Sequence, residues 1–335
     1  MPDTNTSNAN AKNDGKVVDT KKGSWQTSIA DDGKFKRRET TFRRWVRASP
    51  EPGSDDLPAE KDRYHLYVSY ACPWAHRTLI VRALKGLEEV IPFTAVDHFL
   101  GEGGWRFGHA GDEDTVTGAK RIAEIYHRSN PDMTAHFTVP VLFDKKEGVI
   151  VNNESSEIIR MLTREFDAFC KTDEQRAIDL YPEQQRSEID EVNAWIYPQL
   201  NNGVYKAGFA QSQSAYEEAE KEVFDGLARL ETILGKSKFL TGDTLTEADV
   251  RLVTTLLRFD PVYHFHFKLQ RHRLVEFKNV WAFTRLMYQM PAVRSTTNLE
   301  HIVKHYLCSH KSINPFGIIP VSPEIDWEKA DDREF

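Results

Sequence analysis

The chain has 335 residues, of which 40 % are hydrophobic and 28 % are charged. This length predicts two domains, and the composition excludes a disordered, collagen-like or coiled-coil chain. Acidic side chains (51) outnumber basic ones (44), so we expect no nucleic acid partner, because a protein that coats a duplex needs surplus cations. No apolar run reaches the roughly 18 residues of a membrane span, and residues 1–19 hold no secretory segment. We therefore expect no membrane contact and a cytoplasmic location.

The first 62 residues are predicted to be a tail and an extension. Residues 1–23 consist mostly of Asn, Asp, Ser, Thr, Lys and Gly, which predicts a disordered tail. Residues 24–62 contain scattered aromatic residues and a Pro/Gly-rich turn, which indicate an extension and linker lying over a domain already formed. The basic cluster at 34–47 is interpreted as a solvated surface, with anion binding or nuclear import as the alternative.

Residues 63–167 predict an α/β domain. Alternating aromatic and β-branched residues indicate strands, and apolar residues at helical spacing indicate helices. A strand, a helix and a second strand form a parallel crossover, which is followed by an insertion, a β-hairpin and a helix opened by cap-forming residues. These elements are expected at 64–70, 76–86, 91–96, 97–136, 137–143 with 148–151, and 158–166.

Residues 168–304 predict a helical domain, because apolar residues recur there at helical spacing. Thr246 and Asp249 form a capping box at the start of one of its helices, so Asp249 is interpreted as structural. Residues 305–335, rich in Pro, Gly and acidic residues near the end, are expected to form a C-terminal extension. The predicted fold class is α/β followed by all-α.

The strongest local signal is Cys72, which lies between a predicted strand and the first turn of a helix and precedes Pro73. Unpaired N–H groups and the positive end of the helix dipole favour the thiolate there, so we predict a lowered thiol pKa and a reactive nucleophile. The alternative is a buried, unreactive cysteine. Ala75 occupies the position of the second cysteine of a dithiol oxidoreductase, so a second thiol must come from outside the motif. Cys170 and Cys308 have no comparable context.

Two further features of the α/β domain are candidates for ligand binding. Val139-Pro140 at a strand start is a candidate cis peptide, with an edge-strand proline as the alternative. Glu154 and Ser155 begin a helix and offer a carboxylate for an ammonium group and a hydroxyl with free N–H groups for a carboxylate. This pattern matches an α-amino acid head group, and simple helix capping is the alternative.

The histidines are interpreted mainly as structural. His264 and His266 are two positions apart, so on a helix they cannot face one ion, and no metal site is expected. His76, one turn after Cys72, would lower the thiol pKa if it were charged, which we keep as an alternative.

Seven motifs together resemble the glutathionyl-hydroquinone reductases, the Xi class of the glutathione transferase superfamily. The resemblance spans about residues 25–323, and several widely spaced motifs occur in the order typical of the family. They are CPWAHR at 72–77, GWRF at 104–107, TVPVL at 138–142, NNESSE at 152–157, NGVY at 202–205, RFDPVY at 258–263, and HY with SH at 305–306 and 309–310.

The resemblance implies a thioredoxin-like N-terminal domain, a helical C-terminal domain and a glutathione site between them. It implies a cis peptide that holds the glutathione backbone and two tyrosines that line the pocket for the aromatic part of the substrate. The implied glutathione-binding residues are Trp105, His136, Val139, Pro140, Glu154 and Ser155, and the implied catalytic residues are Cys72, Tyr205 and Tyr306.

The implied reaction reduces glutathionyl-hydroquinones to hydroquinones, with glutathione as co-substrate. The Cys72 thiolate attacks the glutathione sulfur, and free glutathione then resolves the mixed disulfide and leaves as oxidised glutathione. The resemblance also implies a homodimer. Two alternatives stay open: an Omega-like thiol transferase or dehydroascorbate reductase, and a non-enzymatic ligand-binding protein.

The chain departs from the family pattern at two positions. His136 stands where the family usually has an arginine that contacts glutathione, which implies a weaker, pH-dependent contact. Leu307 stands where a second aromatic residue is common, which implies a reshaped quinone pocket. Neither position supplies the nucleophile, so the implied reaction type is unchanged.

Overall fold

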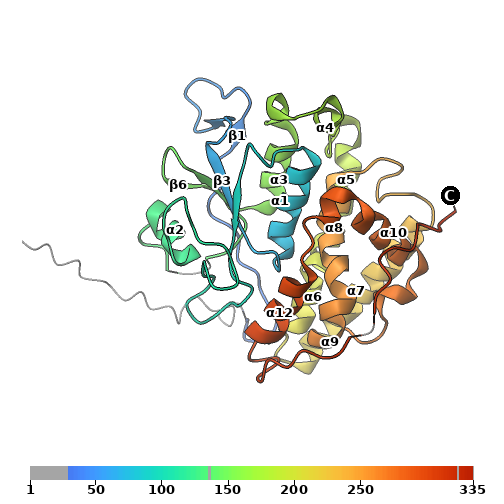
Figure 1. Ribbon diagram of the computed structural model, residues 1–335. Coiled ribbons are helices and arrows are strands. Elements are labelled where there is room, and N and C mark those ends of the chain that lie inside the picture. Colours follow the sequence, from blue (N-terminus) through green and yellow to red (C-terminus); the bar gives the residue numbers. More distant parts are fainter. Residues whose placement is uncertain (1–28, 135–136, 323, 335) are drawn as a thin grey trace, which may run out of the picture.

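The computed structural model describes residues 29–134, 137–322 and 324–334. The chain forms two lobes, one built on a four-stranded sheet and the other entirely helical (Figure 1). The predicted tail at 1–23 and His136 lie outside the described residues. No described helix combines the length and the apolar content needed to cross a membrane.

The sheet of the first lobe is mixed, with strand order β4-β3-β5-β6. β3 pairs with β4 in parallel and with β5 in antiparallel fashion, so the predicted parallel crossover is confirmed. All five residues of β3 are buried, because helices cover both faces of the sheet. The strands are β3 (Tyr64–Val68), β4 (Phe93–Ala95), β5 (Val141–Asp144) and β6 (Val149–Asn152).

Three helices flank this sheet. α1 (Pro73–Leu84) and α3 (Ser155–Arg164) lie on the face that points toward the helical lobe, and α2 (Ile122–Ser129) lies on the opposite face (Figure 1). α2 falls within the segment that the sequence predicted only as an insertion. The helix has eight residues and buries only three side chains, so its apolar face is too short to stand out within a long insertion.

The extension before β3 is bound to the first lobe at several points. β1 (Val46–Arg47) and β2 (Leu57–Pro58) form a parallel pair, with Val46 and Leu57 buried. Arg43 forms a β-bridge with Asn152 and an ion pair with Glu157. The interpretation of the basic cluster as a solvated surface holds for most of its basic side chains, which are exposed even where they form ion pairs, whereas Arg37 and Arg44 are half-buried.

The second lobe is a bundle in which the 22-residue helix α7 packs against α6 and α10. The predicted capping box of Thr246 and Asp249 is confirmed at the start of α8. The helices are α4 (Asp173–Ala177), α5 (Arg186–Ile196), α6 (Gly203–Gly208), α7 (Gln213–Leu234), α8 (Glu247–Arg258), α9 (His264–His266), α10 (Lys278–Gln289), α11 (Pro291–Arg294) and α12 (Leu299–Ser309). Short 3-10 turns lie at Asp167–Phe169, Glu183–Gln185 and Leu274–Glu276, and π-helical segments lie at Tyr197–Asn201 and Phe259–Tyr263.

The two lobes meet along α1. This helix packs against α3 on its own lobe and against α8 and α11 of the helical lobe. α12 runs past the boundary that the sequence placed at 304 and 305, and the chain after it lies over the helical lobe (Figure 1). The N-terminus of α1 is thus placed where both lobes supply neighbours.

Candidate active site

Cys72 lies at the N-terminus of α1, in the turn that leaves β3. It is the extended residue before the helix, with φ −76° and ψ 119°, and its side chain is half-buried. Its thiol donates a hydrogen bond to the carbonyl oxygen of Val139 at 3.3 Å. The Val139-Pro140 peptide is cis and precedes β5. β5 runs antiparallel to β3, so its beginning lies beside the end of β3 and brings Val139 to Cys72.

The predicted lowering of the Cys72 pKa is not the net effect in the structure. Burial is the largest influence and raises the pKa of Cys72. The N–H groups of Ala75 and Trp74 lower it, as the helix terminus was predicted to do, and the charges of Arg258 and Arg37 add to that. The prediction identified one favourable effect but omitted the desolvation of the thiolate.

His76 does not supply a charge to the thiol. It is fully buried, and burial together with the Arg258 charge holds the pKa of His76 well below its usual value, so the ring is neutral. The alternative of a charged His76 is therefore wrong. The buried cation beside Cys72 is Arg258, whose guanidinium donates to the carbonyl oxygens of Ala71 at 2.9 Å and Tyr70 at 3.0 Å. A residue of α8 thus fixes the turn that carries the nucleophile.

Glu154 and Ser155 lie at the beginning of α3. The Glu154 carboxylate accepts a hydrogen bond from the Ser156 N–H at 3.0 Å, so it does cap the helix as the alternative proposed. It also accepts from the Thr40 hydroxyl of the extension at 3.2 Å. Ser155 is buried, and its hydroxyl accepts from Arg77 of α1 at 3.4 Å. Capping leaves the second carboxylate oxygen bound only to a hydroxyl, which a ligand ammonium group can replace.

Tyr205 and Tyr306 are brought together from α6 and α12. Their hydroxyl oxygens are 2.5 Å apart, and the Tyr263 hydroxyl lies 3.1 Å from that of Tyr306. Burial raises the pKa of all three phenols, so they are neutral hydrogen-bond donors near pH 7. The sequence did not single out Tyr263, although it lies in the RFDPVY motif. It ends a π-helical segment, a distortion that is frequent at functional sites.

Trp105 lies against α12. Its ring stacks on His305 at a centroid distance of 4.8 Å, and His305 directly precedes Tyr306. Burial lowers the pKa of His305 to about 4, so this ring is neutral. The structure thus brings Trp105 beside the tyrosine cluster, and His136 lies outside the described residues.

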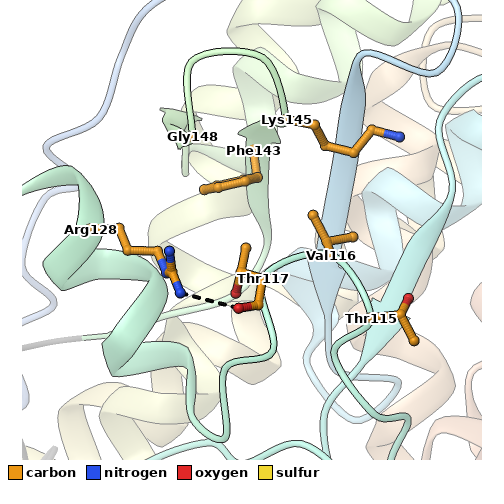
Figure 2. Close-up of a pocket in the computed structure, with 7 residues that line it drawn as sticks. All are labelled: Thr115, Val116, Thr117, Arg128, Phe143, Lys145 and Gly148. Carbon is orange, nitrogen blue, oxygen red and sulfur yellow. Dashed lines mark hydrogen bonds between the residues drawn. The ribbon is translucent and has the colours of Figure 1, made fainter.

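One cavity of the described residues lies away from this site. A cavity of about 500 Å³ lies at the opposite end of β5 from Cys72 (Figure 2). It is lined by Thr115, Val116, Thr117, Arg128, Phe143, Lys145 and Gly148. Within the described part of the chain, no three His, Cys, Asp or Glu side chains gather as metal ligands. Cys170 is buried and Cys308 half-buried, and both are free thiols.

The chain combines a four-stranded mixed sheet, a helical lobe and a half-buried thiol, Cys72, at their junction. This combination indicates a glutathione transferase. The sequence family described as glutathione S-transferase, N-terminal domain, matches residues 71–165. The family described as glutathione S-transferase, C-terminal domain, matches residues 213–285.

Comparisons of the whole chain with known proteins indicate which class of glutathione transferases it belongs to. Glutathionyl-hydroquinone reductase YqjG of Escherichia coli is 49 % identical over 316 residues, which cover 92 % of this chain and 95 % of that protein. Its glutathione-bound structure matches with a TM-score of 0.83 and 50 % identity, over 88 % of this chain and 96 % of that one. Glutathione S-transferase Xi of Phanerochaete chrysosporium matches with a TM-score of 0.85 and 47 % identity, over 91 % and 97 % of the two chains.

Glutathione S-transferase omega-like 2 of Schizosaccharomyces pombe is also similar, at 50 % identity over 87 % of this chain and 94 % of that protein. The chain belongs to the Xi class of the glutathione transferases, the family of the glutathionyl-hydroquinone reductases. The predicted fold class, a thioredoxin-like domain followed by a helical domain, is confirmed.

Proposed function

We propose that this protein reduces glutathionyl-hydroquinones to hydroquinones, with glutathione as its second substrate. One observation carries the proposal: the Cys72 thiol donates to the Val139 carbonyl and lies close enough to Tyr205, which forms a cluster of neutral phenols with Tyr306, for the two groups to interact electrostatically. The position of Cys72 beside the Val139 carbonyl suits the sulfur of a bound glutathionyl group. The phenols suit the oxygen of a hydroquinone, because the two hydrogen bonds within the cluster use two of its three O–H protons and leave one to donate.

The first half-reaction transfers the glutathionyl group to Cys72. The thiolate attacks the sulfur of the conjugate, an S–S bond forms, and the bond from sulfur to the ring carbon breaks. When the conjugate reacts as its keto tautomer, that carbon already bears a hydrogen, and the electron pair moves onto the neighbouring ring oxygen. Protonation of this phenolate completes the hydroquinone, and Cys72 is left in a disulfide with glutathione.

The second half-reaction restores the thiol. The thiolate of free glutathione attacks the glutathione sulfur of the mixed disulfide, and Cys72 leaves as a thiolate. Oxidised glutathione is released, so two sulfurs are oxidised while one carbon–sulfur bond becomes a carbon–hydrogen bond. Ala75 in place of a second cysteine fits this scheme, because no thiol of the motif competes with glutathione.

Ligand binding offsets the raised pKa of the free thiol. The Cys72 S–H donates to the Val139 carbonyl, and a hydrogen bond made by the neutral form disfavours ionisation. A glutathione N–H that takes Val139 as its acceptor removes this bond and shifts Cys72 toward the thiolate. In this proposal Glu154 and Ser155 hold the γ-glutamyl head group.

We assign the remaining glutathione contacts to Trp105, His136 and the Val139-Pro140 backbone, and substrate binding to the tyrosine cluster. We further propose a cytoplasmic homodimer. Three free cysteines suit a reducing compartment, and Phe316 and Val321, which are 87 % and 102 % exposed, offer apolar surface for a second subunit.

The test is a mass spectrum of the intact protein after reaction with glutathionyl-menadiol in the absence of free glutathione. We expect one glutathione adduct at Cys72 and release of one equivalent of menadiol. Cys72→Ser should form no adduct and lose turnover by about 1,000-fold or more, whereas Cys308→Ser, the matched control, should react as wild type.

An Omega-like thiol transferase is the second candidate, since one relative carries an Omega-like name. Turnover of hydroxyethyl disulfide at the same enzyme concentration distinguishes the two. A strong preference for the disulfide, or an adduct without release of menadiol, would reject the proposed reductase activity.

A further inference from the structure

The extension at residues 29–47 crosses the junction of the two lobes. At its beginning the Gly33 carbonyl accepts from the Gln211 N–H at 3.0 Å, and the Phe35 ring lies 5.5 Å from that of Phe209, both on the helical lobe. A few residues later Thr40 donates to Glu154 at the start of α3. The segment between Phe35 and Thr40 is therefore held at both ends and spans the site.

Arg37 is the residue of this span that turns inward. Its side chain is half-buried, whereas those of Lys36 and Arg38 are exposed. Its Nε donates to the side-chain oxygen of Asn202 at 2.9 Å. The guanidinium carbon lies 4.9 Å from the ring centroid of Trp74 and 4.8 Å from that of Tyr205. Arg37 thus occupies the space between the helix that begins after Cys72 and the tyrosine cluster.

The charge of Arg37 has no carboxylate partner within residues 29–134, 137–322 and 324–334. No carboxylate of the described residues forms an ion pair with it, and Asn202 is its one hydrogen-bond partner among them. In contrast, Arg43 and Arg47 of the same extension each pair with a glutamate. The Arg37 charge acts on the site. It favours the ionised forms of Cys72 and Tyr205 and so partly offsets the rise in their pKa that burial causes. The described part of the chain accepts no hydrogen bond from the two terminal nitrogens of Arg37, which a ligand can therefore use.

We propose that Arg37 is a further catalytic residue, which binds the hydroquinone oxygen beside Tyr205 and stabilises the negative charge that reaches this oxygen when the carbon–sulfur bond breaks. A fixed guanidinium at the atom where charge develops accelerates the step without reorganisation. This inference rests on the proposed function and concerns only its first half-reaction, since the second passes no charge to the ring.

The test separates the two half-reactions in Arg37→Met, with Arg38→Met as the matched control from the same span. Single-turnover release of menadiol from glutathionyl-menadiol should slow by about 10- to 100-fold in Arg37→Met. Reduction of the preformed Cys72–glutathione disulfide by glutathione should slow by no more than about threefold, because loss of the Arg37 charge makes Cys72 a slightly poorer leaving group but no charge develops on a ring in this step. Arg38→Met should leave both steps unchanged, and Arg37→Lys should recover part of the first step.

A purely structural role predicts another pattern. If Arg37 only anchors the extension, Arg37→Met slows both half-reactions together or neither, and either result overturns the inference. Menadiol-type release rates for a series of glutathionyl-hydroquinones give a second measurement. Partial misfolding does not affect it, because it lowers all rates of one variant by the same factor. The rate loss in Arg37→Met should grow as the hydroquinone becomes less acidic, and a constant loss across the series would overturn the inference as well. Wild-type protein that releases no menadiol would instead reject the proposed function itself.

Discussion

At the scale of single residues, Arg258 is a buried cation without a carboxylate partner among the described residues. It is fully buried and donates to backbone carbonyls, including that of Thr254, and it lies beside the neutral ring of His76. A buried charge is costly unless it is balanced. The Arg258 charge favours ionisation of Cys72, so the thiolate that forms during the reaction is an anion that this charge stabilises.

Removal of this charge should therefore raise the pKa of Cys72. We expect Arg258→Gln to raise the apparent pKa of Cys72, which lowers the alkylation rate at pH 7 by up to about tenfold. The measurement is the rate of iodoacetamide alkylation against pH. Arg258→Lys keeps the charge and should lie closer to wild type, and an unchanged pKa in Arg258→Gln would contradict the assignment.

The sequence identified Cys72 because its signal is local: a cysteine, a proline and a helix start within a few residues. Arg37 and Arg258 carry no such signal, since they approach Cys72 from segments 35 residues before it and 186 residues after it. The direction of the thiol pKa was mispredicted for the same reason, because burial depends on the whole fold and not on the motif.

At the scale of elements, the capping box of α8 contains a carboxyl group with an unusual pKa. Asp249 accepts hydrogen bonds from the N–H groups of Leu240 and Thr246, both at 2.9 Å. Burial nevertheless raises the pKa of Asp249 from its ordinary 3.8 to about 6. The folded protein thus binds this proton more tightly than the unfolded chain, so the resulting stabilisation is complete below about pH 3.8 and is lost as the pH rises through 6.

We expect the stability difference between wild type and Asp249→Asn to depend on pH in this window. The asparagine cannot titrate, so wild type should gain up to about 3 kcal/mol relative to the variant between pH 7 and pH 4. Urea unfolding at several pH values gives the free energy of unfolding of each protein. The contributions of the other acidic groups are the same in both proteins and cancel in the difference. A constant difference across this range would show that Asp249 titrates normally.

Long elements were predictable from the sequence, and short ones were not. β3 and α3 follow from alternation and helical spacing, and α1, which is buried on most of its surface, follows from its apolar residues at 79–84 before Gly86. α2 was hidden because its helical pattern is only two turns long. β1 and β2, two residues each, are stable only against the sheet lobe, so no local pattern reveals them.

At the scale of the whole molecule, composition and periodicity predicted the two lobes, but not the segments that tie them together. The extension and the C-terminal tail are irregular, and their residues are ordered by partners far away in the sequence. Tyr205, Tyr263 and Tyr306 illustrate the same limit, because they lie up to 101 residues apart and meet only when the helical lobe is complete.

The C-terminal tail leads to a prediction about stability alone. Arg333 is buried and donates to the carbonyls of Leu234 at 3.2 Å and Lys238 at 3.1 Å, the first of which is the last residue of α7. A guanidinium there satisfies carbonyls that a helix leaves unpaired at its C-terminus. Trp327 packs its ring on that of Tyr288, 4.9 Å away, in α10.

We therefore expect Arg333→Ala to lower the free energy of unfolding by about 1 to 3 kcal/mol and Trp327→Ala by about 2 to 4 kcal/mol, measured by urea unfolding. The exposed neighbour Glu334 provides the control, and Glu334→Ala should change stability by less than about 0.5 kcal/mol. All three variants should release menadiol from glutathionyl-menadiol at the wild-type rate under conditions where they are folded, because Arg333 bonds to the end of α7 and Trp327 packs on α10, away from Cys72. A tail variant that keeps its stability but loses this activity would place the C-terminal tail in the active site. That result would contradict the assignment of the N-terminal extension to catalysis and of the C-terminal tail to stability alone.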